Sequence, residues 1–130
     1  MLILTIRTDK PEAELGIYED QKQLTYETWQ AHRELAETIH KKTAEILNKL
    51  SKSQKDVQGL VCFKGPGSFT GLRIGLSVAN ALSYAHDIPI VAAGSEDWIE
   101  QGVKKLISGK NEQIALPTYG SPAHITKARK

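Results

Sequence analysis

The segment from Lys64 to Arg73 carries the residue types that could do chemistry, because glycines and hydroxyl residues stand between an apolar run and a helical pattern. Glycine adopts backbone angles that side chains forbid, and it lets backbone N–H groups approach an anion at the start of a helix. Such a turn is either a cradle for an anion or a rigid elbow whose hydroxyls cap the helix. The elbow residues are Gly65, Pro66, Gly67, Ser68 and Thr70.

The spacing of these residues departs from two nucleotide-binding patterns. A Walker-type loop ends in Lys followed by Ser or Thr, whereas Lys64 precedes this turn and Leu72-Arg73 follows it. A dinucleotide fingerprint needs Gly-x-Gly-x-x-Gly, and Gly65, Gly67 and Gly71 miss that spacing by one residue. Residue chemistry alone favours the structural elbow, because most glycine-rich turns between a strand and a helix bind nothing. We therefore expect no cofactor.

Candidates for catalysis and metal binding are scattered. The four histidines form no His-x-x-x-His pair and none stands near the single cysteine, so no metal site is predicted. A metal-holding carboxylate would be useful at the end of the first strand, but Arg7 stands there, and Asp9 is expected to form the turn beside Pro11. Ser68 has no visible base, and Cys62 lies in an apolar run where it should be buried and inert.

The elements that position the turn make a mixed α/β plan. The predicted elements are, in order, strands over 2–6, 14–18 and 23–29, a helix over about 33–50, a strand over 57–63, a helix over about 70–85, a strand over 88–92 and a helix that Ser95 can cap and that runs to about 107. The first three strands should form an antiparallel meander. The near-continuous apolar run of the fourth indicates a central strand covered on both faces. After a loop over 108–111, residues 113–116 suffice only for an edge strand, and an extended tail is expected to follow.

Composition limits the function classes. The 130 residues have room for one domain with a real core, and the net charge of +2 gives no strong field for nucleic acid or membrane. The basic excess is local, at Lys127, Arg129 and Lys130, where an arm that contacts phosphates and a solvated tail both stay open. One cysteine excludes an internal disulfide, and no signal segment or long apolar run is present, so a cytoplasmic location is expected.

The predicted helix over 70–85 is more apolar than the covering of one sheet requires. One side is expected to face the sheet and presents Ile74, Val78, Ala81 and Ala85. A second seam needs another cover and consists of Leu72, Leu76, Ala79 and Ser83. Either the helix over 33–50 packs on this seam, or another chain does, with Gly71 and Gly75 allowing a close approach. On the second interpretation, Leu76→Arg disrupts partner binding and leaves the fold intact.

Three segments together resemble the TsaB (YeaZ) family, the non-catalytic partner in bacterial tRNA threonylcarbamoyladenosine synthesis. They are Ile-Leu-Thr-Ile-Arg-Thr over 3–8, Lys-Gly-Pro-Gly-Ser-Phe-Thr-Gly-Leu-Arg-Ile-Gly over 64–75, and Asp-Ile-Pro-Ile-Val over 87–91. The resemblance implies a single RNase H-like domain of the actin-like ATPase superfamily, with a five-stranded mixed sheet and flanking helices, over residues 1–107. A short C-terminal extension over 108–130 would follow, in a shortened form that lacks most of the family's second domain.

The resemblance also implies a scaffold that binds a TsaD-type catalytic subunit, in an assembly with a TsaE-type ATPase. Carried over by position, the partner-binding residues would be Gly71, Leu72, Gly75, Leu76, Ala79 and Ser83. A homodimer through the helix over 70–85 and an indirect contact with tRNA stay open. Relatives have Ile-Asp-Thr where this chain has Ile6-Arg7-Thr8, which favours a non-catalytic role. The competing hypothesis is a protease-like or nuclease-like hydrolase that uses Asp9 or Ser68.

Overall fold

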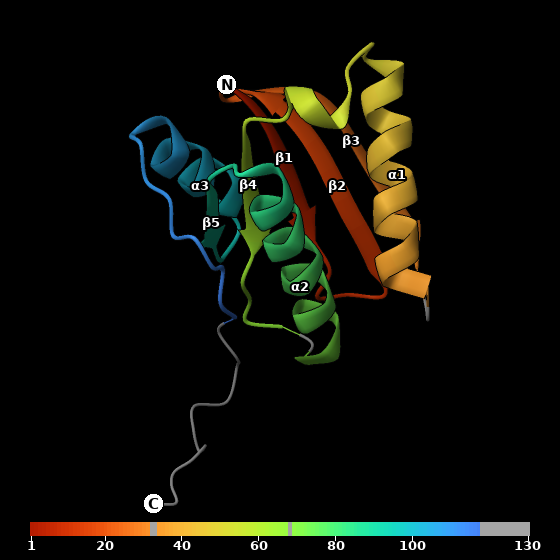
Figure 1. The fold of residues 1–130 in the computed structure, drawn as a ribbon. Coiled ribbons are helices and arrows are strands. Elements are labelled where there is room, and N and C mark those ends of the chain that lie inside the picture. Colours follow the sequence, from red (N-terminus) through yellow and green to blue (C-terminus); the bar gives the residue numbers. More distant parts are fainter. Residues whose placement is uncertain (32–33, 68, 118–130) are drawn as a thin grey trace, which may run out of the picture.

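One five-stranded sheet organises the chain, whose computed structural model describes residues 1–31, 34–67 and 69–117 (Figure 1). The strands lie in the order β3-β2-β1-β4-β5. The elements are β1 (Leu2–Arg7), β2 (Glu12–Glu19), β3 (Lys22–Gln30), α1 (Leu35–Lys49), the short 3₁₀ helix η2 (Gln54–Asp56), β4 (Gly59–Phe63), α2 (Phe69–His86), β5 (Ile90–Ala93) and α3 (Trp98–Ile107).

The sheet combines an antiparallel half with a parallel half. β1, β2 and β3 form the expected meander, with Leu4 opposite Ile17 in the β1–β2 pair. β4 then pairs parallel to β1, and β5 pairs parallel to β4. The carboxyl ends of β1, β4 and β5 therefore meet at one end of the sheet, which is where open α/β sheets commonly place their sites.

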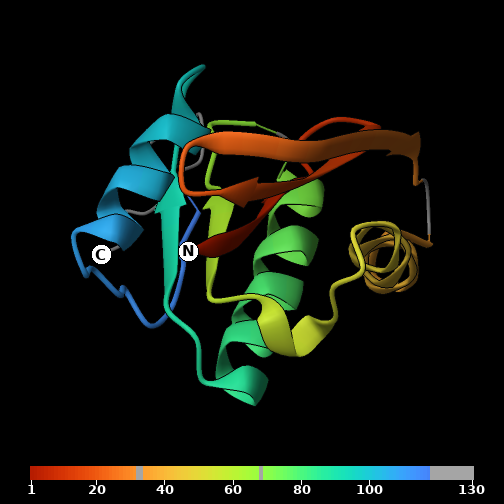
Figure 2. The same cartoon turned by 90° about the horizontal axis from the view of Figure 1, so that it is seen from above.

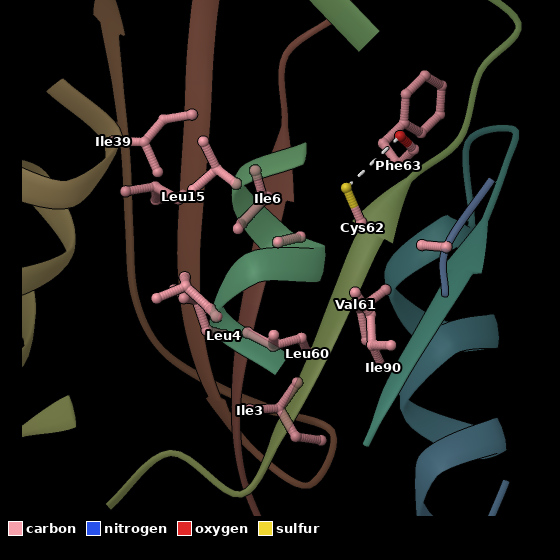
Figure 3. Close-up of a cluster of buried hydrophobic side chains, with 14 of the residues drawn as sticks. Ile3, Leu4, Ile6, Leu15, Ile39, Leu60, Val61, Cys62, Phe63 and Ile90 are labelled. Atoms are coloured by element: carbon pink, nitrogen blue, oxygen red, sulfur yellow. Dashed lines mark hydrogen bonds between the residues drawn. The ribbon is translucent and has the colours of Figure 1, made fainter. Parts of the chain in front are cut away.

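Helices cover the sheet on both faces. α1 and α2 lie over one face, and α3 lies over β4 and β5 on the other (Figures 1 and 2). β4 is buried along its whole length, as its apolar run predicts. The β4 side chains belong to one hydrophobic core, which also contains apolar residues of β1, β2, β5 and α1 (Figure 3). This core holds the ends of the parallel strands in fixed positions.

The predicted order of strands and helices is confirmed, and one local prediction is wrong. Ser95 does not cap the last helix; α3 starts at Trp98 with Asp97 in the N-cap position. Residues 113–116 form no strand, and the side chain of Asn80 rather than a backbone ladder holds Ala115. The expected tail after Pro117 lies outside the described residues. Within the described ranges, no helix is both long and apolar enough to cross a lipid bilayer.

Candidate functional site

The elbow between β4 and α2 is packed against neighbouring backbone. Gly65 has φ +101°, in the region that favours glycine, and the Gly65–Pro66 peptide is cis. A Cβ atom on Gly67 would lie 2.5 Å from Cβ of Asp9, and one on Gly94 would lie 2.5 Å from the carbonyl oxygen of Gly65. These contacts explain the glycines by close packing and favour the rigid elbow over the anion cradle. Ser68 lies outside the described residues.

An ion pair occupies the carboxyl end of β1. Nε of Arg7 donates to Oδ1 of Asp9 at 2.7 Å, and a second guanidinium nitrogen donates to Oδ2 at 3.2 Å. The Asp9 side chain is only 8% exposed and that of Arg7 21%. The hydrogen bond to Asp9 is the main cause that raises the pKa of Arg7. The expectation that Asp9 serves chiefly as a turn residue missed this two-point pairing, which neutralises its carboxylate.

The Arg7 guanidinium stacks on an aromatic ring. Its Cζ atom lies 3.9 Å from the centroid of the Phe63 ring, a cation–π contact. Phe63 in turn packs edge-on against Trp98 of α3, with ring centroids 5.6 Å apart. We call Arg7, Asp9, Phe63 and Trp98 the β1 corner. A guanidinium thus fills the place where a metal-holding carboxylate would be useful.

Other candidate groups do not gather around the β1 corner. Over residues 1–31, 34–67 and 69–117, no three His, Cys, Asp or Glu side chains are placed to hold a metal ion together. His32 and His124 lie outside these ranges. Cys62 is buried, as predicted, and burial raises its pKa to about 12, so its thiol is protonated near neutral pH.

The two glycines at the start of α2 fit against β1. Oγ1 of Thr8 donates to the carbonyl oxygen of Gly71 at 2.7 Å. A Cβ atom on Gly71 would lie 2.1 Å from the Thr8 carbonyl oxygen, and one on Gly75 would lie 2.1 Å from Thr8 Oγ1. Both glycines are therefore explained by packing within the chain. They allow α2 to reach the end of its own first strand.

The burial pattern of α2 differs from the prediction. Leu72, Leu76, Ala79 and Ser83 are all buried inside the chain. Of the side expected to face the sheet, Val78 is buried, Ile74 is half-buried, and Ala81 and Ala85 are exposed. Most of the residues carried over as partner-binding thus pack inside this chain, and the opposite side of α2 is the more exposed one. We call that side the outer face of α2, and its exposed residues are Thr70, Arg73, Ser77, Ala81, Tyr84 and Ala85.

A segment after α3, residues 110–117, runs along the edge of the outer face. Nδ2 of Asn80 donates to the Ala115 carbonyl oxygen at 3.0 Å, and the Ala115 N–H donates to Asn80 Oδ1 at 2.8 Å. We call this segment the strap. Within the strap Ala115 is buried, whereas Ile114 and Leu116 are 61% and 67% exposed, and Tyr84 nearby on α2 is 91% exposed. Sequence reasoning missed Asn80 and the strap, because their pairing joins positions 35 residues apart.

Comparisons with known proteins point in one direction. The family model "TsaD: tRNA N6-adenosine threonylcarbamoyltransferase" matches residues 29–119. The "tRNA threonylcarbamoyladenosine biosynthesis protein TsaB" of Escherichia coli K12 is 30% identical over 107 residues, which cover 78% of this chain and 44% of that protein. The protein of the same name from Bacillus subtilis 168 is 44% identical over 50 residues, covering 38% of this chain and 22% of the relative.

Solved structures share the fold. YeaZ from Pseudomonas aeruginosa aligns with a TM-score of 0.66 at 21% identity, over 78% of this chain and 50% of that one. RuvC of Thermus thermophilus aligns with a TM-score of 0.51 at 14% identity, over 72% of this chain and 64% of that one. The mixed sheet is therefore the RNase H-like fold of the actin-like ATPase superfamily, as expected. The chain spans less than half the length of the three TsaB relatives that match first.

Proposed function

The chain belongs to the TsaB (YeaZ) family, and we propose that it is a non-catalytic subunit that binds a TsaD-type catalytic subunit in the threonylcarbamoyl modification of tRNA adenosine. The observation that carries the proposal is the contrast between the closed β1 corner and the outer face of α2. Charged groups at the corner are paired internally and little exposed, whereas the outer face presents small side chains, Arg73 and the exposed ring of Tyr84.

The β1 corner supports the non-catalytic part of the proposal. A carboxylate can bind a metal ion or accept a proton only if its oxygens are available. Both Asp9 oxygens accept hydrogen bonds from Arg7, and the side chain has little contact with solvent. The corner therefore stabilises the sheet end. A hydrolase that uses Asp9 would first have to release this pair, and no observation favours that alternative.

The outer face of α2 supports the binding part. Ser77 and Ala81 are small and exposed near the middle of the helix, so a partner helix can approach the backbone closely there. Tyr84 offers a large ring at one end, of a residue type that is enriched at interfaces. A hollow of about 260 Å³ opens between the starts of α1 and α2, lined by Leu35 and Ile74 among others. An apolar side chain of a partner would fit this hollow.

Light scattering on a size-exclusion column tests the proposal, with the chain alone and mixed with the TsaD-type protein of the same organism. We expect a mixed complex for the natural chain and separate elution for Ala81→Arg, which puts a long cation in the middle of the outer face. Ile107→Arg is the matched control, because Ile107 is exposed on α3 across the sheet. Separate elution of the natural chain, or equal binding by Ala81→Arg, would contradict the proposal.

The same face could serve a homodimer, because a helix face can pair with its own copy about a two-fold axis. The chain alone would then elute as a dimer that Ala81→Arg dissociates. A TsaE-type ATPase would join the larger assembly, and any contact with tRNA would be indirect. The single cysteine suits a reducing, cytoplasmic location for this assembly.

A further inference from the structure

β5 is an edge strand, and its own sequence contains none of the residues that usually prevent such strands from pairing with another chain. Unpaired edges invite pairing with another chain, and proteins commonly guard them with charged residues, proline or bulges. β5 consists of Ile90, Val91, Ala92 and Ala93, which are all apolar and buried. β3, at the opposite edge, carries Lys22 and Glu27. Protection of β5 must therefore come from outside the strand.

Each outward-facing backbone group of β5 is bonded to a residue of the strap or of α3. The Ile90 N–H donates to Asn111 Oδ1 at 3.1 Å, and the Ile90 carbonyl oxygen accepts from the Glu112 N–H at 2.9 Å. The Ala92 N–H donates to Glu112 Oε1 at 2.8 Å. These three bonds replace the rungs that a neighbouring strand would supply.

An ion pair completes the set. Nζ of Lys105 donates to the Ala92 carbonyl oxygen at 3.0 Å and lies 3.5 Å from the second oxygen of Glu112. The donors and acceptors on this side of Ile90 and Ala92 are thus all satisfied without a backbone ladder. We call Lys105, Asn111 and Glu112 the edge clamp.

We propose that the edge clamp is a built-in block on sheet extension, and that its release lets β5 pair with β5 of a second copy of this chain. The occupant is a second copy because the exposed strand would be apolar, short and identical in both molecules, so that antiparallel pairing about a two-fold axis satisfies both edges at once. The clamp keeps the sheet at five strands and leaves the outer face of α2 as the surface for association.

Glu112→Ala tests the clamp, because it removes the acceptor of the Ala92 N–H and the partner of Lys105. In hydrogen exchange read by NMR we expect the Ala92 amide to exchange about tenfold faster or more, as for a lost hydrogen bond to a charged group. Light scattering should show a dimer whose fraction rises with concentration. Glu100→Ala, which breaks an exposed pair with Lys104 on the same helix, is the matched control and should change neither readout.

A second variant separates edge pairing from a general loss of structure. Ala92→Pro removes the outward N–H while leaving the side that faces β4 intact, and proline is tolerated at such edge positions. Glu112→Ala with Ala92→Pro should therefore stay monomeric. Unchanged exchange at Ala92 in Glu112→Ala, a monomeric Glu112→Ala chain, or a dimer that survives Ala92→Pro would each overturn the proposal.

Discussion

The inner and outer sides of α2 both carry small residues, but these serve opposite purposes. On the inner side, Gly71 and Gly75 bring the helix against Thr8 at the end of β1, with no room for a Cβ atom. On the outer side, Ser77 and Ala81 are exposed and touch solvent. Small side chains therefore allow close packing within the chain on the inner side, whereas on the outer side they leave the helix surface open to a partner. Burial distinguishes the two cases.

The inner side also connects α2 to the β1 corner. Thr8 bonds to Gly71, and its neighbours Arg7 and Asp9 form the ion pair that closes the end of the strand. A change on the inner side should thus act on stability, whereas a change on the outer face should act on association. Matched substitutions on the two sides of α2 separate these two effects.

Leu76→Arg gives the sharpest contrast with Ala81→Arg. Leu76 is buried, so the substitution places a charge in the core and should cost about 4 kcal/mol of the free energy of unfolding. Ala81 is exposed, and the same new side chain there should change stability by no more than about 0.5 kcal/mol. Urea unfolding followed by circular dichroism measures both. Equal stabilities would mean that the helix is rotated relative to this description.

Gly71→Ala tests the close approach to β1. The added Cβ would meet the Thr8 carbonyl oxygen, which is backbone and can give way only if α2 shifts. We expect a loss of about 3 kcal/mol, larger than the gain in helix propensity of about 1 kcal/mol. Ser77→Ala on the outer face is the control and should be close to neutral. The midpoint of thermal unfolding gives the ranking.

A paired variant sharpens this test. Gly75→Ala conflicts with the side chain of Thr8 rather than with backbone, so Thr8→Ala should relieve part of its cost. The same Thr8→Ala change should leave the cost of Gly71→Ala in place, because that contact is to the Thr8 carbonyl oxygen. Relief of both glycine variants, or of neither, would show that the conflict lies elsewhere.

The rotation of α2 shows where sequence reasoning ends. The pattern correctly predicts a helix with two apolar sides, because residues three and four apart share a face. Both seams were apolar, so periodicity alone gave no preference for which one meets the sheet. The choice depends on Thr8, which lies 63 residues away and bonds to Gly71. No local pattern contains that information.

Other parts of the molecule divide in the same way. The continuous apolar run of β4 and the meander of β1 to β3 were predictable, since they depend on local alternation and short turns. The strap was not, because Asn80 and Glu112 hold it through side-chain bonds that no periodicity encodes. The sequence indicates that Arg7 stands where a metal-holding carboxylate would be useful. Its pairing with Asp9 and its stacking on Phe63 depend on the three-dimensional arrangement of these side chains, which no sequence pattern gives.

Arg7→Ala extends the comparison from the inner side to the β1 corner. The substitution leaves the Asp9 carboxylate with little solvent and without its partner, and it removes the contact with the Phe63 ring. We expect a loss of about 2 kcal/mol in chemical unfolding, part of which Arg7→Lys restores by keeping a positive charge. Binding to the TsaD-type protein should persist below the unfolding midpoint. Loss of binding by a folded Arg7→Ala chain would link the corner directly to the interface.

The buried thiol of Cys62 can show how often the core opens in variants of the outer face and of the β1 corner. Burial raises its pKa to about 12 from an ordinary value of 9.0, so the stabilising contribution of the protonated thiol is fully present below pH 9 and is lost as the pH rises towards 12. At pH 8, alkylation by iodoacetamide should therefore require opening of the core. Mass spectrometry should detect slow labelling of the natural chain, a similar rate for Ala81→Arg and a rate about thirtyfold higher for Arg7→Ala, whose lower stability opens the core more often. Equal rates in the two variants would mean that the β1 corner contributes no more to the core than the outer face does.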